Sequence, residues 1–272
     1  MSLLYVFLFL KSLSFSQNVN IEDYRKMIEE ALSRQQGDRG GRTTEFRIER
    51  VGGSVEILSM GEERAHLSNN YQYPLEVGDI IRVGYDGEAN IYINNIGVIK
   101  VLRNTEFEIS ETQGEDILSL NYGSIVSRIE RFKNSYTFKV KTPSAICNIK
   151  GTQFAVEHNK LSRESIFGVI DEGEIEVYAG ENESENNVYK VSKNQEIVIN
   201  PLSKRFRVSN LSRLSIYKGK ISAIKKALIE HKKKWRYFSQ AERIKYRQRL
   251  FNKNYNQKSM KKSLKSKTRV SR

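Results

Sequence analysis

The sequence contains few of the residues that covalent and metal chemistry most often use. Its single cysteine, Cys147, excludes an internal disulfide framework and a cysteine-rich zinc site. The three histidines, His66, His158 and His231, lie far apart and leave little material for a metal or catalytic centre. No run of about 18 apolar residues occurs, which excludes a polytopic membrane protein. With only 3 prolines and 38% hydrophobic residues, the chain is neither collagen-like nor wholly disordered.

Motifs of common enzyme classes are also absent from the sequence. It contains no G-x-S-x-G elbow, no H-E-x-x-H motif, no phosphate-binding P-loop and no G-x-G-x-x-G between a strand and a helix. Neighbouring carboxylates such as Glu172 and Glu174 are typical of the solvated face of a strand, and nothing distinguishes an acid from a base. The sequence therefore predicts a protein that is not an enzyme, with no metal and no cofactor.

Charge is distributed unevenly along the chain. The net charge of +14 comes from 46 basic and 32 acidic residues. From Arg213 to the end there are 21 Lys and Arg against two acids, a net of +19, so the first 212 residues carry a net of −5. The chain is thus a mildly acidic body followed by a strongly basic C-terminal part, and its high isoelectric point does not describe its whole surface.

The first sixteen residues have the pattern of an export signal. Leu3 to Leu10 is a run of eight apolar residues, and Ser14-Phe15-Ser16 places small residues before a cleavage point at Gln17. The alternative is a buried helix or strand of the fold. We predict a signal peptide over residues 1–16, which places the mature chain in the periplasm or outside the cell.

Changes in hydrophobic period divide the remaining chain. Residues 17–44 predict a helix, capped by Asn20, and a Gly-rich linker. From 45 to 208 the period is two, and beyond 209 it becomes helical again, with Ile221, Ile224, Leu228 and Trp235 on one face. A capping box, Ser239 to Glu242, starts a second basic helix that carries Ile244 and Phe251 and ends near 255. Residues 256–272 predict a disordered basic tail.

The middle segment predicts an all-β fold. Alternating stretches such as residues 88–93, 105–109 and 174–178 are four to eight residues long, and Gly and Asn turn signals separate them. Strands at this spacing are typical of a sandwich or barrel. We predict a jelly-roll-like β-sandwich of many short antiparallel strands, flanked by a short N-terminal helix and basic C-terminal helices. A roll or a β-helix is the alternative.

Three blocks between about Leu75 and Ile199 carry distinctive motifs. They are residues 77–97, with Gly-Asp before an apolar pair; 142–156, with Thr-Pro and Lys-Gly-Thr before an aromatic strand; and 168–177, a strand pair around a glycine. In this order the three blocks resemble the FecR domain family. Lys150 stands where the family usually has Arg. The motif residues, as binding determinants or as structural corners, are Gly78, Asp79, Gly84, Thr142, Pro143, Lys150, Gly151, Thr152, Phe154 and Gly173.

The resemblance implies binding or signalling by protein contact. The best-known members carry a cytoplasmic anti-sigma region, a membrane helix and a periplasmic FecR domain. We do not extend the sigma-factor role to this chain, because no candidate membrane helix lies between an N-terminal regulatory region and Glu45. The expectation is an exported envelope module of the FecR type that binds a protein or a glycan.

Cations and aromatic residues alternate in the basic C-terminal part, which predicts contact with an anionic partner. Such a partner could be an anionic envelope polymer, a membrane surface, an acidic protein face that includes this chain's own body, or nucleic acid. Export disfavours nucleic acid, whereas a cytoplasmic nucleic-acid-binding protein is the alternative. The residues proposed for this contact are Lys232, Lys233, Lys234, Trp235, Arg236, Arg243, Lys245, Arg247 and Arg249.

Overall fold

The computed structural model describes the β-rich body and the segment that follows it. The predicted signal peptide, the predicted N-terminal helix and the basic tail from 256 lie outside the described residues. Those described are 44–59, 64–68, 71–112, 115–130, 138–180, 183, 187–203 and 205–251.

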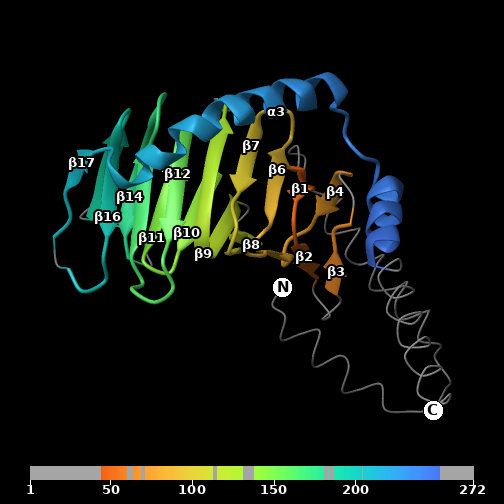
Figure 1. The fold of residues 1–272 in the computed structure, drawn as a ribbon, viewed down its shortest axis with the longest axis horizontal. Helices are drawn as coiled ribbons and strands as arrows, with labels where there is room; N and C mark the ends of the chain where they lie inside the picture. Colours follow the sequence, from red (N-terminus) through yellow and green to blue (C-terminus); the bar gives the residue numbers. More distant parts are fainter. Residues whose placement is uncertain are drawn as a thin grey trace, which may run out of the picture. The chain divides into compact units, whose positions relative to one another are not determined.

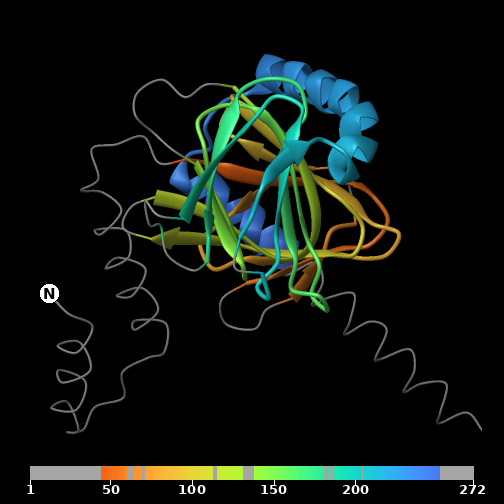
Figure 2. The ribbon, with the colours of Figure 1, turned by 90° about the vertical axis from the view of Figure 1, so that its left-hand side faces the viewer.

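Seventeen strands in this part of the chain form two facing sheets (Figures 1 and 2). In spatial order, the first sheet, sheet A, contains β4 (Tyr73–Leu75), β1 (Phe46–Gly52), β6 (Glu88–Ile93), β7 (Gly97–Val101), the end of β9 (Glu115–Ile129), β12 (Gln153–His158), β13 (Ser165–Val169), β16 (Gln195–Ile199) and β17 (Val208–Asn210). The second, sheet B, contains β3 (Arg64–His66), β2 (Val55–Leu58), β5 (Ile80–Val83), β8 (Thr105–Thr112), the start of β9, β10 (Phe138–Thr142), β11 (Ala145–Ile149), β14 (Glu174–Ala179) and β15 (Val188–Ser192).

Strand β9 joins the two sheets. Its first half pairs with β8 in sheet B, and its second half pairs with β7 and β12 in sheet A. The change occurs at Gly123, whose φ of +99° is accessible to glycine and strained for other residues. Gly123 also lies against Thr105, where a side chain would overlap the neighbouring backbone. A glycine therefore allows one strand to turn from one sheet into the other.

One pairing of named strands departs from the antiparallel expectation. β10 runs parallel to the first half of β9, with Val140 opposite Leu118, whereas the other ladders are antiparallel. The reason is topological: β9 ends in sheet A, so the chain must return to the start of β9 before β10 can pair with it in sheet B. The prediction of an all-β sandwich with C-terminal helices is confirmed, and the strand order is the one given above.

A helical segment covers the outer face of sheet A. It consists of the 3-10 helix η2 (Arg213–Lys220) and the α-helix α3 (Ile221–Lys234) (Figure 1). The predicted apolar residues Ile221, Ile224 and Leu228 are buried against sheet A, in a cluster separate from the main core between the sheets. Because of this cover, sheet A strands such as β13 are buried on both faces, whereas sheet B strands such as β14 alternate between buried and open positions.

Candidate binding surfaces

The first motif block shapes a turn around a buried carboxylate. Gly78 has a φ of +90°, and its N–H donates to the carbonyl of Ile109 (2.7 Å). Asp79 is 1% exposed, and its Oδ2 accepts a hydrogen bond from the N–H of Glu76 (2.9 Å). Gly84 ends the following strand, and its N–H donates to Ser54 O (2.9 Å). These residues fix the backbone at both ends of β5.

Arg247 binds this buried carboxylate from the C-terminal segment. Its Nη1 and Nη2 donate to Asp79 Oδ2 (2.6 Å) and Oδ1 (3.0 Å), a bidentate pair. Arg247 also donates to Ser59 Oγ (2.7 Å), and its Nε lies 3.1 Å from Glu76 Oε2. Of the anionic partners expected for this segment, Arg247 therefore meets the chain's own body, whose Asp79 and Glu76 hold its guanidinium. The acceptor in this bidentate pair, Asp79, is itself one of the motif residues.

The second motif block surrounds a buried polar network at the β10–β11 hairpin. Thr142 is buried, Pro143 is exposed in the two-residue turn, and Ser144 is buried behind it. Ser165 Oγ donates to Thr142 Oγ1 (2.8 Å) and accepts from Ser144 Oγ (2.6 Å). Pro143 thus lies in the turn, where its missing N–H removes no hydrogen bond from the strand pair.

His158 completes this network. Its Nδ1 lies 2.8 Å from Ser165 Oγ, which already donates its one proton to Thr142, so His158 Nδ1 is the donor. Burial lowers the pKa of His158, and the nearby charge of Arg163 lowers it further. The serine is fully buried and the histidine 3% exposed, so this Ser–His contact holds two strands together and presents no nucleophile to solvent.

The remaining motif residues form a corner between β11, β12 and β14. Thr152 is buried, and its Oγ1 donates to the carbonyl of Glu172. Gly173 has a φ of +90°, and an added Cβ would lie 2.7 Å from Thr152 Cβ. Gly151 has a φ of +117°, and Phe154 is fully buried. Thr152 and Phe154 are buried, Gly151 is half-buried, and Gly173 is exposed, so the corner reaches the surface only through its glycines.

Lys150 differs from its neighbours in this block. Its side chain is 63% exposed and lies 3.3 Å from Glu176 on the adjacent strand β14. Lys150 and Pro143 are therefore the exposed residues of the second motif block, whereas Thr142, Thr152 and Phe154 reach no surface.

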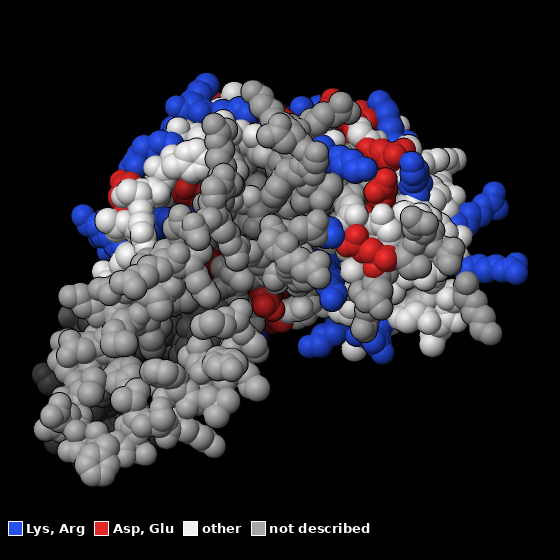
Figure 3. Space-filling model, turned by 180° about the vertical axis from the view of Figure 1, so that it is seen from behind, with Lys and Arg blue, Asp and Glu red and all other residues white. Residues whose placement is uncertain are grey.

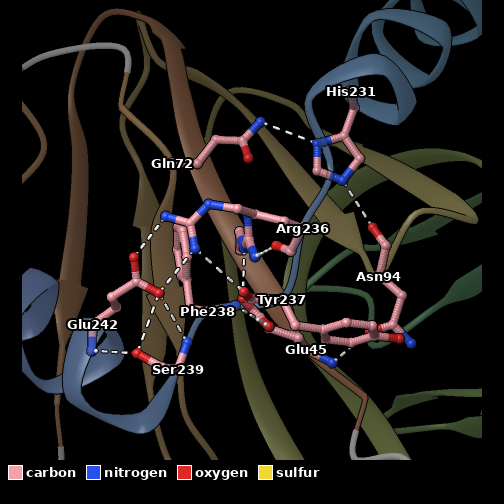
Figure 4. A network of polar contacts seen from close by, with 10 residues as sticks. Glu45, Gln72, Asn94, His231, Arg236, Tyr237, Phe238, Ser239 and Glu242 are labelled. Atoms are coloured by element: carbon pink, nitrogen blue, oxygen red, sulfur yellow. Dashed lines mark hydrogen bonds and ion pairs between the residues drawn. The ribbon is translucent and has the colours of Figure 1, made fainter.

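A clasp formed by residues 231–251 closes the β1 end of the sandwich (Figure 4). The guanidinium of Arg47, on β1, lies between Trp235 and Phe238, 4.1 and 3.5 Å from their ring centroids. Arg47 Nε donates to Glu45 Oε1 (2.6 Å), while Phe238 N–H donates to Glu45 Oε2 (3.3 Å). Arg47 also donates to the carbonyl of Arg236. Trp235 was expected on the apolar face of α3, but the helix ends at Lys234 and Trp235 is extended.

His231 anchors the end of α3 to the same site. Its Nε2 donates to the carbonyl of Asn94 (2.8 Å), and its Nδ1 accepts from Gln72 Nε2 (3.2 Å), so the imidazole is neutral and fully satisfied (Figure 4). The ring stacks on Tyr92 at 4.1 Å. Burial lowers the pKa of His231, and the charge of Arg47 lowers it further. The hydrogen bond to the Asn94 carbonyl raises the pKa and so opposes these two effects.

The predicted capping box is confirmed. Ser239 N–H donates to Glu242 Oε2 (3.0 Å), and Glu242 N–H donates to Ser239 Oγ (3.3 Å). Arg236 adds a bidentate pair at 2.9 and 2.6 Å, and this pair is the main cause that lowers the pKa of Glu242 to about 2. Helical residues follow from 240. Ile244 is 49% exposed, whereas Leu250, which the apolar pattern missed, is buried in the main core.

The other proposed cations remain at the surface or close to it. Lys232 lies 2.6 Å from Glu130, and Lys233 lies 2.9 Å from Glu230. The exposed ones are Lys232, Lys233, Lys234, Arg236, Lys245 and Arg249, and Arg243 is half-buried. Figure 3 shows Lys and Arg side chains along the upper rim, the side on which Figure 1 draws α3. The structure therefore divides the proposed anionic-partner set into internal residues (Trp235, Arg247) and surface residues.

The outer face of sheet B carries an ordered row of polar side chains. His66 Nδ1 lies 3.1 Å from Glu56 Oε1, and Arg82 Nε lies 2.6 Å from Glu106 Oε2. The other oxygen of Glu106, Oε1, accepts a hydrogen bond from Asn121 Nδ2 (3.1 Å). Glu56 and Arg82 are cross-strand neighbours, as are Arg82 and Glu106. We call this row the charge ladder. Opposite charges on adjacent strands stabilise one another.

Neither metal binding nor a membrane span is evident among the described residues. Within those ranges, no three or more His, Cys, Asp and Glu side chains gather in a group that could hold a metal ion. No helix in the same part of the chain combines the length and the apolar character needed to cross a bilayer.

Comparison with known proteins finds a family match over part of the two-sheet domain. The FecR protein family model matches residues 79–171 of the chain. The family match relates the chain to signalling modules. No curated protein matches it.

Two solved structures are similar over part of the chain. Both are crystal structures described as a "putative anti-sigma factor" from Parabacteroides distasonis ATCC 8503, at 2.50 and 1.65 Å resolution. Each is 17% identical to this chain and covers 50% of it, with TM-scores of 0.43 and 0.42. The chain covers 62% of their length, which is less than two thirds.

Proposed function

We propose that this protein is an exported, non-catalytic envelope module that binds a protein partner through the outer face of sheet B. The FecR domain over residues 79–171 supports a signalling-related role. The apolar segment at residues 3–10 supports export to the periplasm or beyond. The two features together indicate recognition outside the cytosol.

The observation that carries the choice of surface is the difference between the two sheets. The helical segment covers the outer face of sheet A, so its strands are buried on both sides. Sheet B keeps an open outer face with alternating exposure, and the charge ladder crosses five of its strands. An open sheet face with ordered positive and negative positions gives a protein partner electrostatic specificity without needing a cavity.

Export is tested by purifying the native protein from fractionated cells and sequencing its N-terminus. The expected result is a mature chain that begins near Gln17 in the periplasmic or secreted fraction. An intact Met1 in a cytosolic fraction would contradict the localisation.

The binding surface is tested by photo-crosslinking in cells. A photoreactive residue at Lys141 or Lys190, both exposed on sheet B, is expected to give one discrete crosslinked band. Arg82→Glu reverses one position of the ladder and should abolish that band, whereas Lys226→Glu makes the same charge change on α3 and should retain it. Equal loss in both variants, or crosslinking only from α3, would contradict the assignment of sheet B.

A further inference from the structure

The outward side of the helical segment has residues that the fold itself does not use. Ile221, Ile224, Leu228 and His231 pack onto the body. With 100° between successive helical residues, Lys226, Ile229 and Lys233 lie on the opposite side of α3. Ile216 in η2 is likewise directed away from the buried Leu214 and Tyr217. We call Ile216, Lys226, Ile229 and Lys233 the ridge face.

Two large aliphatic side chains are exposed on the ridge face. Ile216 is 71% exposed and Ile229 is 56% exposed, among the largest exposures of any described apolar residue. Ile229 lies three residues after Lys226 and four before Lys233, so two ammonium groups flank an apolar tip. Aliphatic residues bordered by lysines on a helix that lies along a surface are typical of interfacial membrane contact.

The charge around the ridge face is strongly positive. Residues 213–251 contain 13 Lys and Arg and two acids, and residues 252–272 add eight cations and no acid. The two lysines on the inner flanks of α3 contact the body: Lys225 lies 3.8 Å from Asp171, and Lys232 lies 2.6 Å from Glu130. Lys226 is exposed, and the side chain of Lys233 is 62% exposed and lies 2.9 Å from Glu230 within α3, so among the described residues neither lysine forms an ion pair with the body. An anionic surface therefore complements this side of the molecule.

The aromatic residues of the clasp distinguish between anionic partners. Binding of single-stranded nucleic acid needs aromatic rings on which bases stack. Trp235 and Phe238 enclose Arg47, and Phe238 also stacks on Tyr246 at 4.8 Å. Trp235 was expected to contact an anionic partner, but both rings are used within the fold. On the ridge face itself the exposed apolar groups are aliphatic, which suits acyl chains better than bases, whereas the exposed aromatic Tyr237 lies beyond the end of α3.

We infer that the ridge face docks the protein onto an anionic phospholipid surface, with Lys226 and Lys233 on headgroup phosphates and Ile229 at the acyl boundary. Because the helical segment covers sheet A and sheet B is the opposite layer, docking by the ridge face turns the charge ladder away from the bilayer. The surface proposed for the protein partner stays accessible while the module is bound to the membrane. This inference stands on the ridge residues alone and does not require sheet B to bind anything.

The test uses the purified full chain and two kinds of vesicle, phosphatidylcholine alone and an equal mixture with phosphatidylglycerol. Binding is expected only to the anionic vesicles and is expected to weaken with salt. The variant Lys226→Gln/Ile229→Ser/Lys233→Gln should weaken binding by about 10-fold or more, because it removes two headgroup contacts and the apolar tip. The matched control Lys141→Gln/Lys160→Gln/Leu161→Ser makes the same chemical changes off the ridge and should change binding by less than about two-fold.

A second readout reports on depth. Cys147 is fully buried, so an environment-sensitive dye attached to Ile229→Cys labels a single accessible site. Its emission should shift to the blue on anionic vesicles, whereas the same dye at the 95% exposed Leu161, as Leu161→Cys, should not respond.

Three outcomes would overturn the inference: equal loss in the ridge variant and its control, no dye response at position 229, or tighter binding to single-stranded RNA than to anionic vesicles. The first would assign the affinity to charge in general, the second would exclude contact by the ridge face, and the third would favour nucleic acid as the partner.

Discussion

The contact between Arg247 and Asp79 should be a large contribution to the stability of the domain. The guanidinium is 11% exposed and the carboxylate 1% exposed, and the two are joined by bonds of 2.6 and 3.0 Å. Removing one partner of such a pair costs about 3–5 kcal/mol, because the other charge stays buried without compensation. Asp79 keeps one hydrogen bond from Glu76 N–H, so we expect Arg247→Ala to fall at the lower end, about 3 kcal/mol.

The assay is urea unfolding of the full chain, with a thermal melt beside it. A loss of about 3 kcal/mol corresponds to a fall in Tm of roughly 6–12 °C for a domain of about 200 residues. Arg249→Ala makes the same change at an exposed position of the same helix and should cost less than about 0.5 kcal/mol. Arg247→Lys should recover only part of the loss, because an ammonium cannot make the bidentate contact. Equal midpoints for Arg247→Ala and Arg249→Ala would refute the argument that the C-terminal segment is held through Asp79.

Three further predictions follow from the fold. His158 and His231 are buried with lowered pKa values, so these histidines take up protons in the unfolded chain before they do so in the folded one as the pH falls below about 6.5. The free energy of unfolding should therefore reach its highest value above that pH and decrease below it. Equal free energies from urea titrations at pH 7.5 and 5.5 would contradict this. Gly123→Ala should destabilise the domain by about 1–3 kcal/mol more than Gly180→Ala. Both glycines have a φ near +100°, but of the two only Gly123 lacks room for a side chain. Equal unfolding midpoints for the two variants would show that the backbone conformation alone matters. Deleting residues 253–272 should leave the Tm almost unchanged, and a fall of many degrees in a thermal melt would place that segment in the core.

The clasp changes how the basic C-terminal part should be understood. Its sequence suggests a uniform cationic arm, but the described residues divide into two groups with different roles. Arg47, Trp235 and Phe238 fasten the segment to β1, while Lys226 and Lys233 stay outward on α3. A variant that neutralises cations without regard to this division would mix a stability effect with a binding effect.

The candidate site was only partly predictable from the residues. The motif blocks correctly located the turns, because glycines such as Gly78 and Gly173 are needed wherever the backbone takes a positive φ. Residues that the pattern did not single out, Glu45, Arg47 and Asn94, proved central to the clasp. No local signal marks them, because each interacts with a residue of the clasp more than a hundred positions away. Glu45 also contacts Arg47 and Asn94, which are closer in the sequence.

The sequence by itself determined the features that depend on near neighbours. The two-residue period of the strands, the inward residues Ile221, Ile224 and Leu228, and the capping box at Ser239 all follow from spacings of two to four residues, at which side chains of one element share a face or meet. Only the tertiary structure decided which charges are internal and which sheet face is open. Arg247 and Arg249 are equivalent in composition, yet one meets Asp79 and the other meets water, because they lie about 200° apart around one helix and only the fold decides which side of that helix faces Asp79.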